Sequence, residues 1–357
     1  MAEAAPERRA MVVGCGLIGG SIGLALRAAG WHVTGRDVDP GRLESALALG
    51  AIDAAGDDPL AELTFVATPV TAVPGEVRRA LEVTDGLVTD VASVKAPLAE
   101  LMADPRYVGG HPMAGSEQEG VAGARADLFG GAVWVLTPVP GTDDEAFAAV
   151  RSVILSLGAE VVALPPEEHD RMVAVVSHVP HLAAATLMAL ADERSSEHRA
   201  LLRLAAGGFR DMTRVASGHP AIWPDICATN RDAIVATLDR YVDELVAVRN
   251  VVAAGDRDAL VTRLEAARSA RRSLPSRLGA DAELVEVRLG IADEAGALAR
   301  VLLQAAELGV SVADVEIAHS MEGEGGVLVL VVEAEPAVRL AEVLARGGAA
   351  VNVVPLA

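Results

Sequence analysis

The eight residues from Gly110 to Glu117 hold the side chains best suited to chemistry in this chain of 357 residues. His111 follows a short strand-like run, Tyr107 to Gly109, and the next residue, Pro112, restricts the backbone at His111 to extended geometry. A histidine with an unperturbed pKa near ~6.5 can accept a proton at neutral pH and is the commonest general base. We therefore predict that His111 is a catalytic base at the end of a strand.

A second cluster, Gly207 to Arg214, places cations in a chain whose formal net charge is -20. Arg210 and Arg214 are one helical turn apart, so they could project together from a helix. A pair of guanidinium groups can hold a carboxylate, which suggests a site for an acidic substrate. The alternative is a solvated helix face with ordinary ion pairs. Trp223 follows nearby and is by itself typical of a core residue.

Histidines also gather in the segment that precedes this cluster. His169 is followed by Asp170, and His178 and His181 are three residues apart, hence neighbours on a helix. Pro180 lies between the last two and predicts a kink, because it removes a backbone donor. We predict no metal site, because no further carboxylate or cysteine cluster is near enough in sequence to complete a ligand set.

A glycine-rich turn near the N-terminus predicts a dinucleotide site. Gly14, Gly16 and Gly19 separate an apolar strand, Ala10 to Val13, from a helical pattern. Such glycines allow a tight turn, close approach of a pyrophosphate and close packing of helix on strand. The expected cofactor contacts are Gly14, Gly16, Leu17, Ile18, Gly19, Asp37 and Thr68.

Asp37 ends the second predicted strand, 18 residues after Gly19. A carboxylate near this spacing binds the ribose hydroxyls of NAD and repels the extra phosphate of NADP. The neighbouring Arg36 could instead accept that phosphate, so NADP remains possible.

Strands and helices continue to alternate up to residue 165, which predicts a Rossmann-type doubly wound α/β sheet. The ligand site of such a sheet lies at the carboxyl ends of its strands. Thr68 and Ser93 follow two of these ends, and Lys95 is close by. Ser93 could contact substrate, cap the helix predicted from Lys95 to Met102, or do both.

The remaining chain divides into two further predicted domains. Residues 166–278 show only helical periodicity, and their richness in alanine, leucine and valine suggests a homodimer interface. Residues 279–357 follow a βαββαβ order, which is ferredoxin-like. The predicted domains are therefore 1–165, 166–278 and 279–357.

Composition limits the class of protein. The acidic charge argues against binding of nucleic acid or anionic membrane. Only two cysteines are present, Cys15 and Cys227, which favours a reducing compartment. The N-terminus has no signal-like apolar segment, and no apolar run was expected to reach the ~18 residues of a membrane helix. We predict a cytoplasmic protein.

Five motifs, in this order, resemble the prephenate dehydrogenase family and its arogenate-using relatives in tyrosine biosynthesis. They are Val13 to Ser21, Asp90 to Lys95, Gly110 to Glu117, Ser177 to His181, and Gly207 to Arg214 together with Trp223. The terminal unit resembles an ACT domain, an amino-acid-sensing module. In its loop, Asp293 to Leu298, Ala295 stands where proline is usual.

The resemblance implies an NAD-dependent oxidative decarboxylation of prephenate to 4-hydroxyphenylpyruvate. It implies that His111 is the base, that Arg214 binds a substrate carboxylate, and that Ser93 is also catalytic. It further implies a substrate pocket formed by Ser116, His181, Gly207, Arg210 and Trp223, and tyrosine as an effector at the ACT-like unit.

Three alternatives differ in substrate or in class. Arogenate would yield tyrosine directly and differs from prephenate by an ammonium in place of a keto group. A generic β-hydroxyacid or imine dehydrogenase would turn over NAD without releasing carbon dioxide. A non-catalytic sensor would bind nucleotide and amino acid only, and the presence of His111, Ser93 and Arg214 argues against it.

Overall fold

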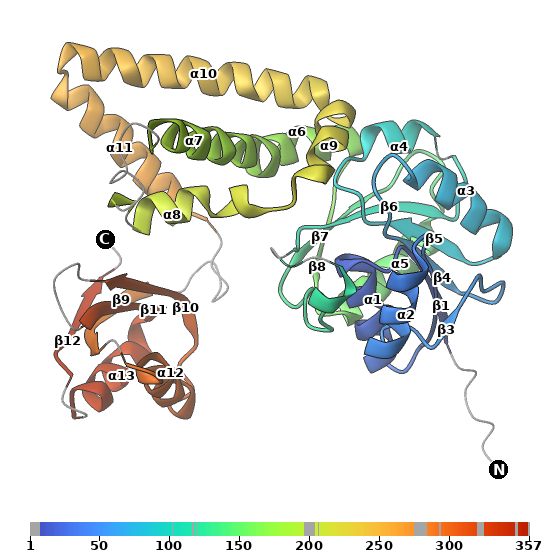
Figure 1. Ribbon diagram of the computed structural model, residues 1–357, viewed down its shortest axis with the longest axis horizontal. Coiled ribbons are helices and arrows are strands. Elements are labelled where there is room, and N and C mark those ends of the chain that lie inside the picture. The colour runs from blue at the N-terminus through green and yellow to red at the C-terminus, as the bar shows by residue number, and fades with distance from the viewer. Residues whose placement is uncertain are drawn as a thin grey trace. The chain divides into compact units, whose positions relative to one another are not determined.

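The computed structural model describes residues 8–101, 103–115, 118, 120–195, 204–205, 207–274, 284–292, 294–319, 325–346 and 349–355. The chain forms two compact units, residues 1–247 and 248–357. The elements are labelled in Figure 1.

The first unit is built on an eight-stranded sheet of order β3-β2-β1-β4-β5-β6-β7-β8. All neighbouring strands are parallel except β6 and β7, which are antiparallel. The strands are β1 (Arg9–Val13), β2 (His32–Arg36), β3 (Ala54–Ala55), β4 (Leu63–Val66), β5 (Leu87–Asp90), β6 (Tyr107–Pro112), β7 (Val133–Thr137) and β8 (Glu160–Ala163). The helices between them are α1 (Leu17–Ala28), α2 (Pro40–Leu49), α3 (Val73–Val83), α4 (Ala96–Leu101), the 3₁₀ turn η1 (Val121–Gly123) and α5 (Asp144–Ser156). The predicted doubly wound α/β sheet is confirmed, and the strand order reverses between β1 and β4.

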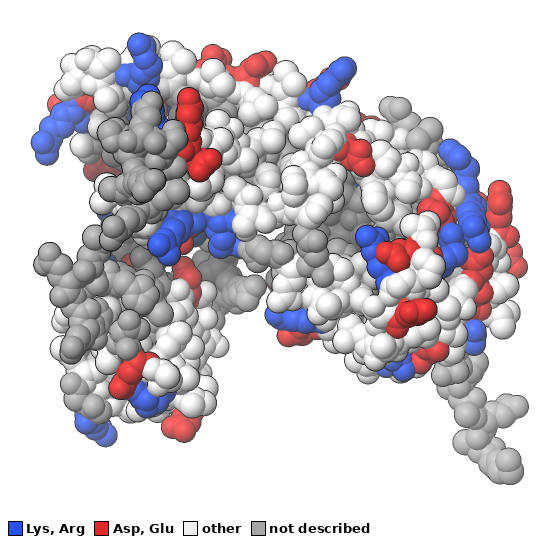
Figure 2. All heavy atoms as spheres, viewed as in Figure 1, with Lys and Arg blue, Asp and Glu red and all other residues white. Residues whose placement is uncertain are grey.

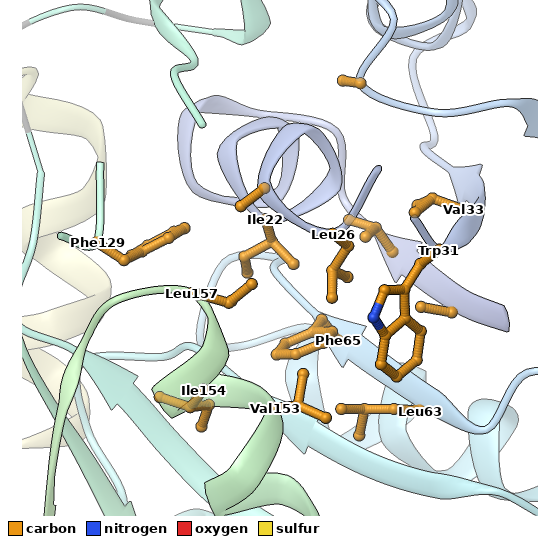
Figure 3. Packing of buried hydrophobic residues seen from close by; sticks show 14 of the residues in the cluster. Ile22, Leu26, Trp31, Val33, Leu63, Phe65, Phe129, Val153, Ile154 and Leu157 are labelled. Atoms are coloured by element: carbon orange, nitrogen blue, oxygen red, sulfur yellow. The ribbon is translucent and has the colours of Figure 1, made fainter. Parts of the chain in front are cut away.

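Two apolar clusters cover the two faces of this sheet. On β1, Ala10 and Val12 belong to one cluster, and Met11 and Val13 to the other. Successive strand residues point to opposite faces, so a strand buried on both faces must be apolar throughout. Figure 3 shows the first cluster, in which Ile22 and Leu26 of α1 lie over Phe65 of β4, with Ile154 of α5 beside them. Residues of α3 and α4 belong to the second cluster.

Helices make up the rest of the first unit, as predicted. They are α6 (Pro166–Val173), the π-helical turn η2 (Ala174–His178), α7 (Val179–Ser195), α8 (Gly207–Thr213), the 3₁₀ turns η4 (Arg214–Ser217) and η5 (Pro220–Ile222), α9 (Trp223–Thr229) and α10 (Arg231–Ala254). Ala174, Val179, Ile226 and Ile234 of these helices join the second apolar cluster. The π-helical turn η2 ends two residues before Pro180, where the sequence predicted a kink.

The stretch Pro166–Arg194 corrects one expectation from sequence. Its 29 residues have the length and composition of a helix that could cross a membrane, although only 28% of its most apolar window is buried within the protein. The expectation of no such stretch failed because α6, η2 and α7 follow one another without a break.

An open groove of about 1870 Å³ borders α6, α7, α9 and α10, and its lining includes Val175, Val179, Leu187, Tyr241 and Leu245. Figure 2 shows a mostly uncharged surface over α7 and α10.

The second unit contains the end of α10, α11 (Arg257–Arg272) and a four-stranded antiparallel sheet of order β10-β11-β9-β12. Its elements are β9 (Leu284–Ala292), α12 (Ala297–Glu307), β10 (Val312–His319), β11 (Gly325–Glu333), α13 (Ala334–Arg346) and β12 (Val351–Pro355). This is the predicted βαββαβ order. Val301 of α12 and Leu340 of α13 are buried with Val287 and Leu330 of the sheet.

Candidate active site

The predicted dinucleotide turn lies at the point where the strand order reverses. Gly14 has φ +94°, and its amide donates to the Arg36 carbonyl at 2.7 Å. A Cβ on Gly19 would lie 1.9 Å from the Gly14 carbonyl oxygen, so only glycine fits there. A Cβ on Gly16 would meet no atom within 4 Å. The turn is therefore tightly packed on the protein side and open at Gly16, where α1 begins.

Other features of this turn fit a bound dinucleotide. Leu17, Ile18 and Gly19 form the first turn of α1, whose free N–H groups favour a phosphate. Thr68, just after β4, has a buried hydroxyl oxygen with no hydrogen-bond partner in the described part of the chain. Its methyl group would lie 3.2 Å from a Cβ on Gly14, so Thr68 borders the turn.

Asp37 and Arg36 lie at the end of β2 with different roles. One carboxylate oxygen of Asp37 accepts from the Cys15 amide at 2.8 Å, which fixes the side chain beside the glycine turn. The Asp37 carboxylate and, more strongly, burial raise the pKa of the Cys15 thiol to about 11, so this thiol is neutral at pH 7. Arg36 forms ion pairs with Asp57, at 2.9 Å, and with Glu76. The Arg36 guanidinium is thus already held by two carboxylates.

His111 lies within a strand, which differs from the sequence prediction. The strand β6 continues through Pro112 because it pairs with antiparallel β7, where His111 faces Val135. The imidazole is half-buried. Its Nδ1 atom lies 2.8 Å from Nε2 of His169 on α6, and the two rings meet edge to face.

Asp170 connects His169 to the loop that carries Ser93. Its Oδ1 lies 2.8 Å from His169 Nδ1 and also accepts from the Lys95 amide at 2.8 Å. Its Oδ2 accepts from the Ala96 amide at 2.9 Å. Asp170 therefore caps α4, which begins at Ala96, so the alternative in which Ser93 is the cap is wrong. Ser93 itself is half-buried in this loop.

A buried ion pair lies beneath the loop. The Lys95 ammonium contacts Asp90 Oδ1, and both side chains are at most 1% exposed. Asp90 also accepts from the Ala92 amide at 2.8 Å and from the Tyr107 hydroxyl at 2.6 Å. Burial lowers the pKa of Lys95, and the Asp90 carboxylate opposes this shift. Lys95, which the sequence places close to a strand end of the predicted ligand site, is a buried ion-pair partner of Asp90.

The other candidate histidines lie around Asn230 and Trp223. Asn230 donates from Nδ2 to the Asp170 carbonyl at 2.9 Å, and the same atom lies 3.2 Å from His178 Nδ1. His181 stacks on Trp223 with ring centroids 3.7 Å apart, and His178 meets the edge of the same ring at 6.2 Å. A continuous set of contacts thus runs from His111 to Trp223.

The two arginines predicted to hold a carboxylate, Arg210 and Arg214, lie on the segment that packs against α7. Gly207, Arg210 and Arg214 are exposed in the protomer. The α-helix ends at Thr213 and a 3₁₀ turn begins at Arg214, so the predicted single helical turn between the two arginines is interrupted. Arg210 donates from Nε to the Ala205 carbonyl at 3.2 Å. Ser116, predicted to contact substrate, lies outside the described residues.

Burial sets the protonation of the histidines. It lowers the pKa of His111 well below the ordinary value, and the positive charges possible at His169, Lys95 and His178 lower it further. Burial also lowers the pKa of His181. His111 is therefore neutral at pH 7 and can accept a proton.

The lowered pKa of His178 should make the free energy of unfolding depend on pH. Burial lowers its pKa to about 4, whereas an unfolded chain protonates histidine near ~6.5. Below pH ~6.5 the unfolded state binds the extra proton, so the free energy of unfolding falls with pH, and the loss approaches about 3 kcal/mol at pH 4. We expect His178→Gln to lose less stability than the unsubstituted protein between pH 7 and pH 4.5 in urea unfolding. Equal losses of stability in the two proteins would contradict a lowered pKa at His178.

Among the described residues, no group of three or more histidine, cysteine, aspartate or glutamate side chains could hold a metal ion. The doubly wound sheet, the glycine turn at its switch point and a neutral histidine on another strand of the same sheet define a nicotinamide-dinucleotide-dependent oxidoreductase.

Comparisons with known proteins indicate which family of these oxidoreductases the chain belongs to. Residues 22–163 match the model of the prephenate dehydrogenase nucleotide-binding domain, and residues 165–266 match that of the prephenate dehydrogenase dimerization domain. The chain is 33% identical to prephenate dehydrogenase of Bacillus subtilis, over 89% of this chain and 90% of the relative. The chain belongs to the prephenate dehydrogenase family.

Two solved structures are also similar. The crystal structure of prephenate dehydrogenase from A. aeolicus, in complex with hydroxyphenyl propionate and NAD+, has a TM-score of 0.70 and 28% identity, over 75% of this chain and 99% of that one. The crystal structure of Synechocystis arogenate dehydrogenase has a TM-score of 0.64 and 31% identity, over 74% of this chain and 98% of that one.

Proposed function

We propose that this protein catalyses the NAD-dependent oxidative decarboxylation of prephenate to 4-hydroxyphenylpyruvate. The observation that carries the proposal is a neutral, half-buried His111 in a family member whose dinucleotide turn is intact. Bound at this turn, NAD would supply the acceptor for a hydride from the ring carbon that bears the hydroxyl group. The substrate then loses its ring carboxylate as carbon dioxide and becomes aromatic.

The residues of the chain bind and orient the substrate and move one proton. His111 accepts the proton of the substrate hydroxyl as the oxidised carbon forms. Ser93 lies in the loop that leads into α4 and contacts the same hydroxyl region. Arg214 holds a substrate carboxylate, and Ser116, His181, Gly207, Arg210 and Trp223 form the pocket around it.

Gly14, Gly16, Leu17, Ile18, Gly19 and Thr68 hold the dinucleotide phosphates, and Asp37 holds the adenosine ribose. The ion pairs of Arg36 with Asp57 and Glu76 support NAD over NADP. A guanidinium paired with two carboxylates attracts a 2′-phosphate less than an unpaired one does. Asp37 itself repels that phosphate.

Arogenate is the second candidate substrate. It has support from the 31% identity to an arogenate dehydrogenase over 74% of this chain. Prephenate and arogenate differ only in the side chain remote from His111, so the same base can serve either one.

The proposal is tested by assaying the purified protein with prephenate and with arogenate, each with NAD and with NADP. We expect NADH and carbon dioxide in equal amounts from prephenate with NAD, and a lower kcat/KM in the other three arms. A higher kcat/KM with arogenate would assign the second candidate. NADH without carbon dioxide would point to a generic dehydrogenase, and no turnover in any arm would contradict both candidates.

Dimerisation, location and regulation complete the proposal. The protein acts as a cytoplasmic homodimer, in which a second copy covers the apolar stretch Pro166–Arg194, and it binds neither membrane nor nucleic acid. The dimerization-domain match over 165–266 supports the homodimer. The three domains are 1–165, 166–278 and 279–357. The last is an ACT-like domain that binds tyrosine as an effector, although Asp293 of its loop lies outside the described residues.

A further inference from the structure

The contact between His111 and His169 restricts where each ring carries its proton. Asp170 Oδ1 accepts a hydrogen bond from His169 Nδ1 at 2.8 Å, because a carboxylate can only accept. In a neutral His169 the Nε2 atom is then the acceptor. His111 Nδ1, 2.8 Å from that atom, must therefore be the donor. A neutral His111 in this arrangement has its free lone pair on Nε2.

We propose that His169 and Asp170 are positioning residues that hold His111 in the tautomer protonated on Nδ1, which makes Nε2 the atom that receives the substrate proton. The inference rests on the proposed function, since a free lone pair matters only if His111 acts as a base. If His169 were instead cationic, its Nε2 would donate to His111. The His111 proton would then lie on Nε2, and no base would be available.

The position of Asp170 is itself fixed from several sides. The amides of Lys95 and Ala96 donate to its carboxylate, and Asn230 donates to its carbonyl. His169 is fully buried, so water does not compete for its nitrogens. One carboxylate thus fixes both the tautomer of His111 and the loop that leads from Ser93 into α4.

The same chain of contacts stabilises the charge that forms during the reaction. When Nε2 accepts the hydroxyl proton, His111 becomes an imidazolium with a proton on each nitrogen, and no proton needs to leave. Among the described residues, the charged or titratable groups that act on it are Lys95, His169 and His178, and each of them disfavours a cation at His111. The Asp170 carboxylate, reached through His169, opposes this effect, as a buried carboxylate does for the histidine of a catalytic triad.

The first test is direct. Nitrogen-15 NMR of the histidine-labelled full-length protein distinguishes a protonated ring nitrogen from an unprotonated one. We expect His111 to carry its proton on Nδ1 and to lose this preference in His169→Met. A proton on Nε2 of His111 in the unsubstituted protein would overturn the inference.

The second test separates positioning from packing. His169→Gln keeps an amide oxygen where Nε2 was, so it can accept from His111, whereas His169→Met cannot. We expect His169→Met to lower kcat about 10²-fold with KM changed less than about threefold, and His169→Gln to recover at least about tenfold of that loss. Equal losses in both variants, or a loss below about threefold in His169→Met, would overturn the inference.

Failure of the proposed function gives a different pattern. If the unsubstituted protein oxidises neither prephenate nor arogenate while His111 still carries its proton on Nδ1, the tautomer assignment stands and the catalytic role does not. If the protein turns over prephenate but its tautomer does not depend on His169, the function stands and the positioning role is wrong.

Discussion

Replacing His111 by asparagine lowers kcat by at least about 10²-fold with prephenate and NAD, which is the contribution expected of a general base. Asparagine places an amide nitrogen near the position of Nδ1, so it can still donate to His169 Nε2 and keep the contact seen at 2.8 Å. It removes Nε2, the atom that we propose receives the substrate proton. The expected result is therefore a loss in kcat without a matching loss in thermal stability or in NAD affinity.

His32 provides the matched control for this substitution. It is half-buried in β2, and its nearest charged partner is Asp53, 3.9 Å away. His32→Asn should leave kcat within about twofold of the unsubstituted value, because it changes no group that contacts substrate. Steady-state assays with both variants measure these changes in kcat. A loss below about tenfold in His111→Asn would mean that another group accepts the proton.

The parts of the site that depend on local sequence could be predicted. Gly14, Gly16 and Gly19 lie within six residues of one another, and a Cβ at Gly19 would overlap the carbonyl oxygen of Gly14 in the same turn. Periodicity located nearly all the strands, because a strand buried on both faces must be apolar throughout. The strand of His111 was predicted too short, because its last residues are held by pairing with β7, which is distant in sequence.

The contacts that orient His111 could not be predicted, because they join distant parts of the chain. His169 is 58 residues from His111, and Asp170 is 75 residues from Lys95. His169 and Asp170 were noticed only as possible metal ligands, and Asn230 was not noticed at all. The adjacent pair of a histidine and an aspartate was the available signal, but its partners depend on where α6 packs.

Substituting Lys95 by methionine has the largest expected effect on stability. It leaves the Asp90 carboxylate without its cation at a site where Asp90 is 0% exposed. Removing one partner of a buried ion pair costs about 3–5 kcal/mol, because the remaining charge is neither solvated nor paired. The hydrogen bonds from the Tyr107 hydroxyl and the Ala92 amide offset only part of this cost. Urea unfolding at pH 7 measures the difference.

The matched experiment removes both charges. In the double variant Lys95→Met with Asp90→Asn, no carboxylate is left unpaired, so we expect it to be more stable than Lys95→Met alone. Arg125→Ala, which breaks the ion pair with Asp127 on the surface, should cause no measurable change. If Lys95→Met were as stable as Arg125→Ala, the buried pair would contribute nothing to the fold. If the double variant were less stable than Lys95→Met, the Asp90 carboxylate would stabilise the fold even without its cation, through the Tyr107 hydroxyl and the Ala92 amide, and the cost of Lys95→Met would not come from an unpaired charge.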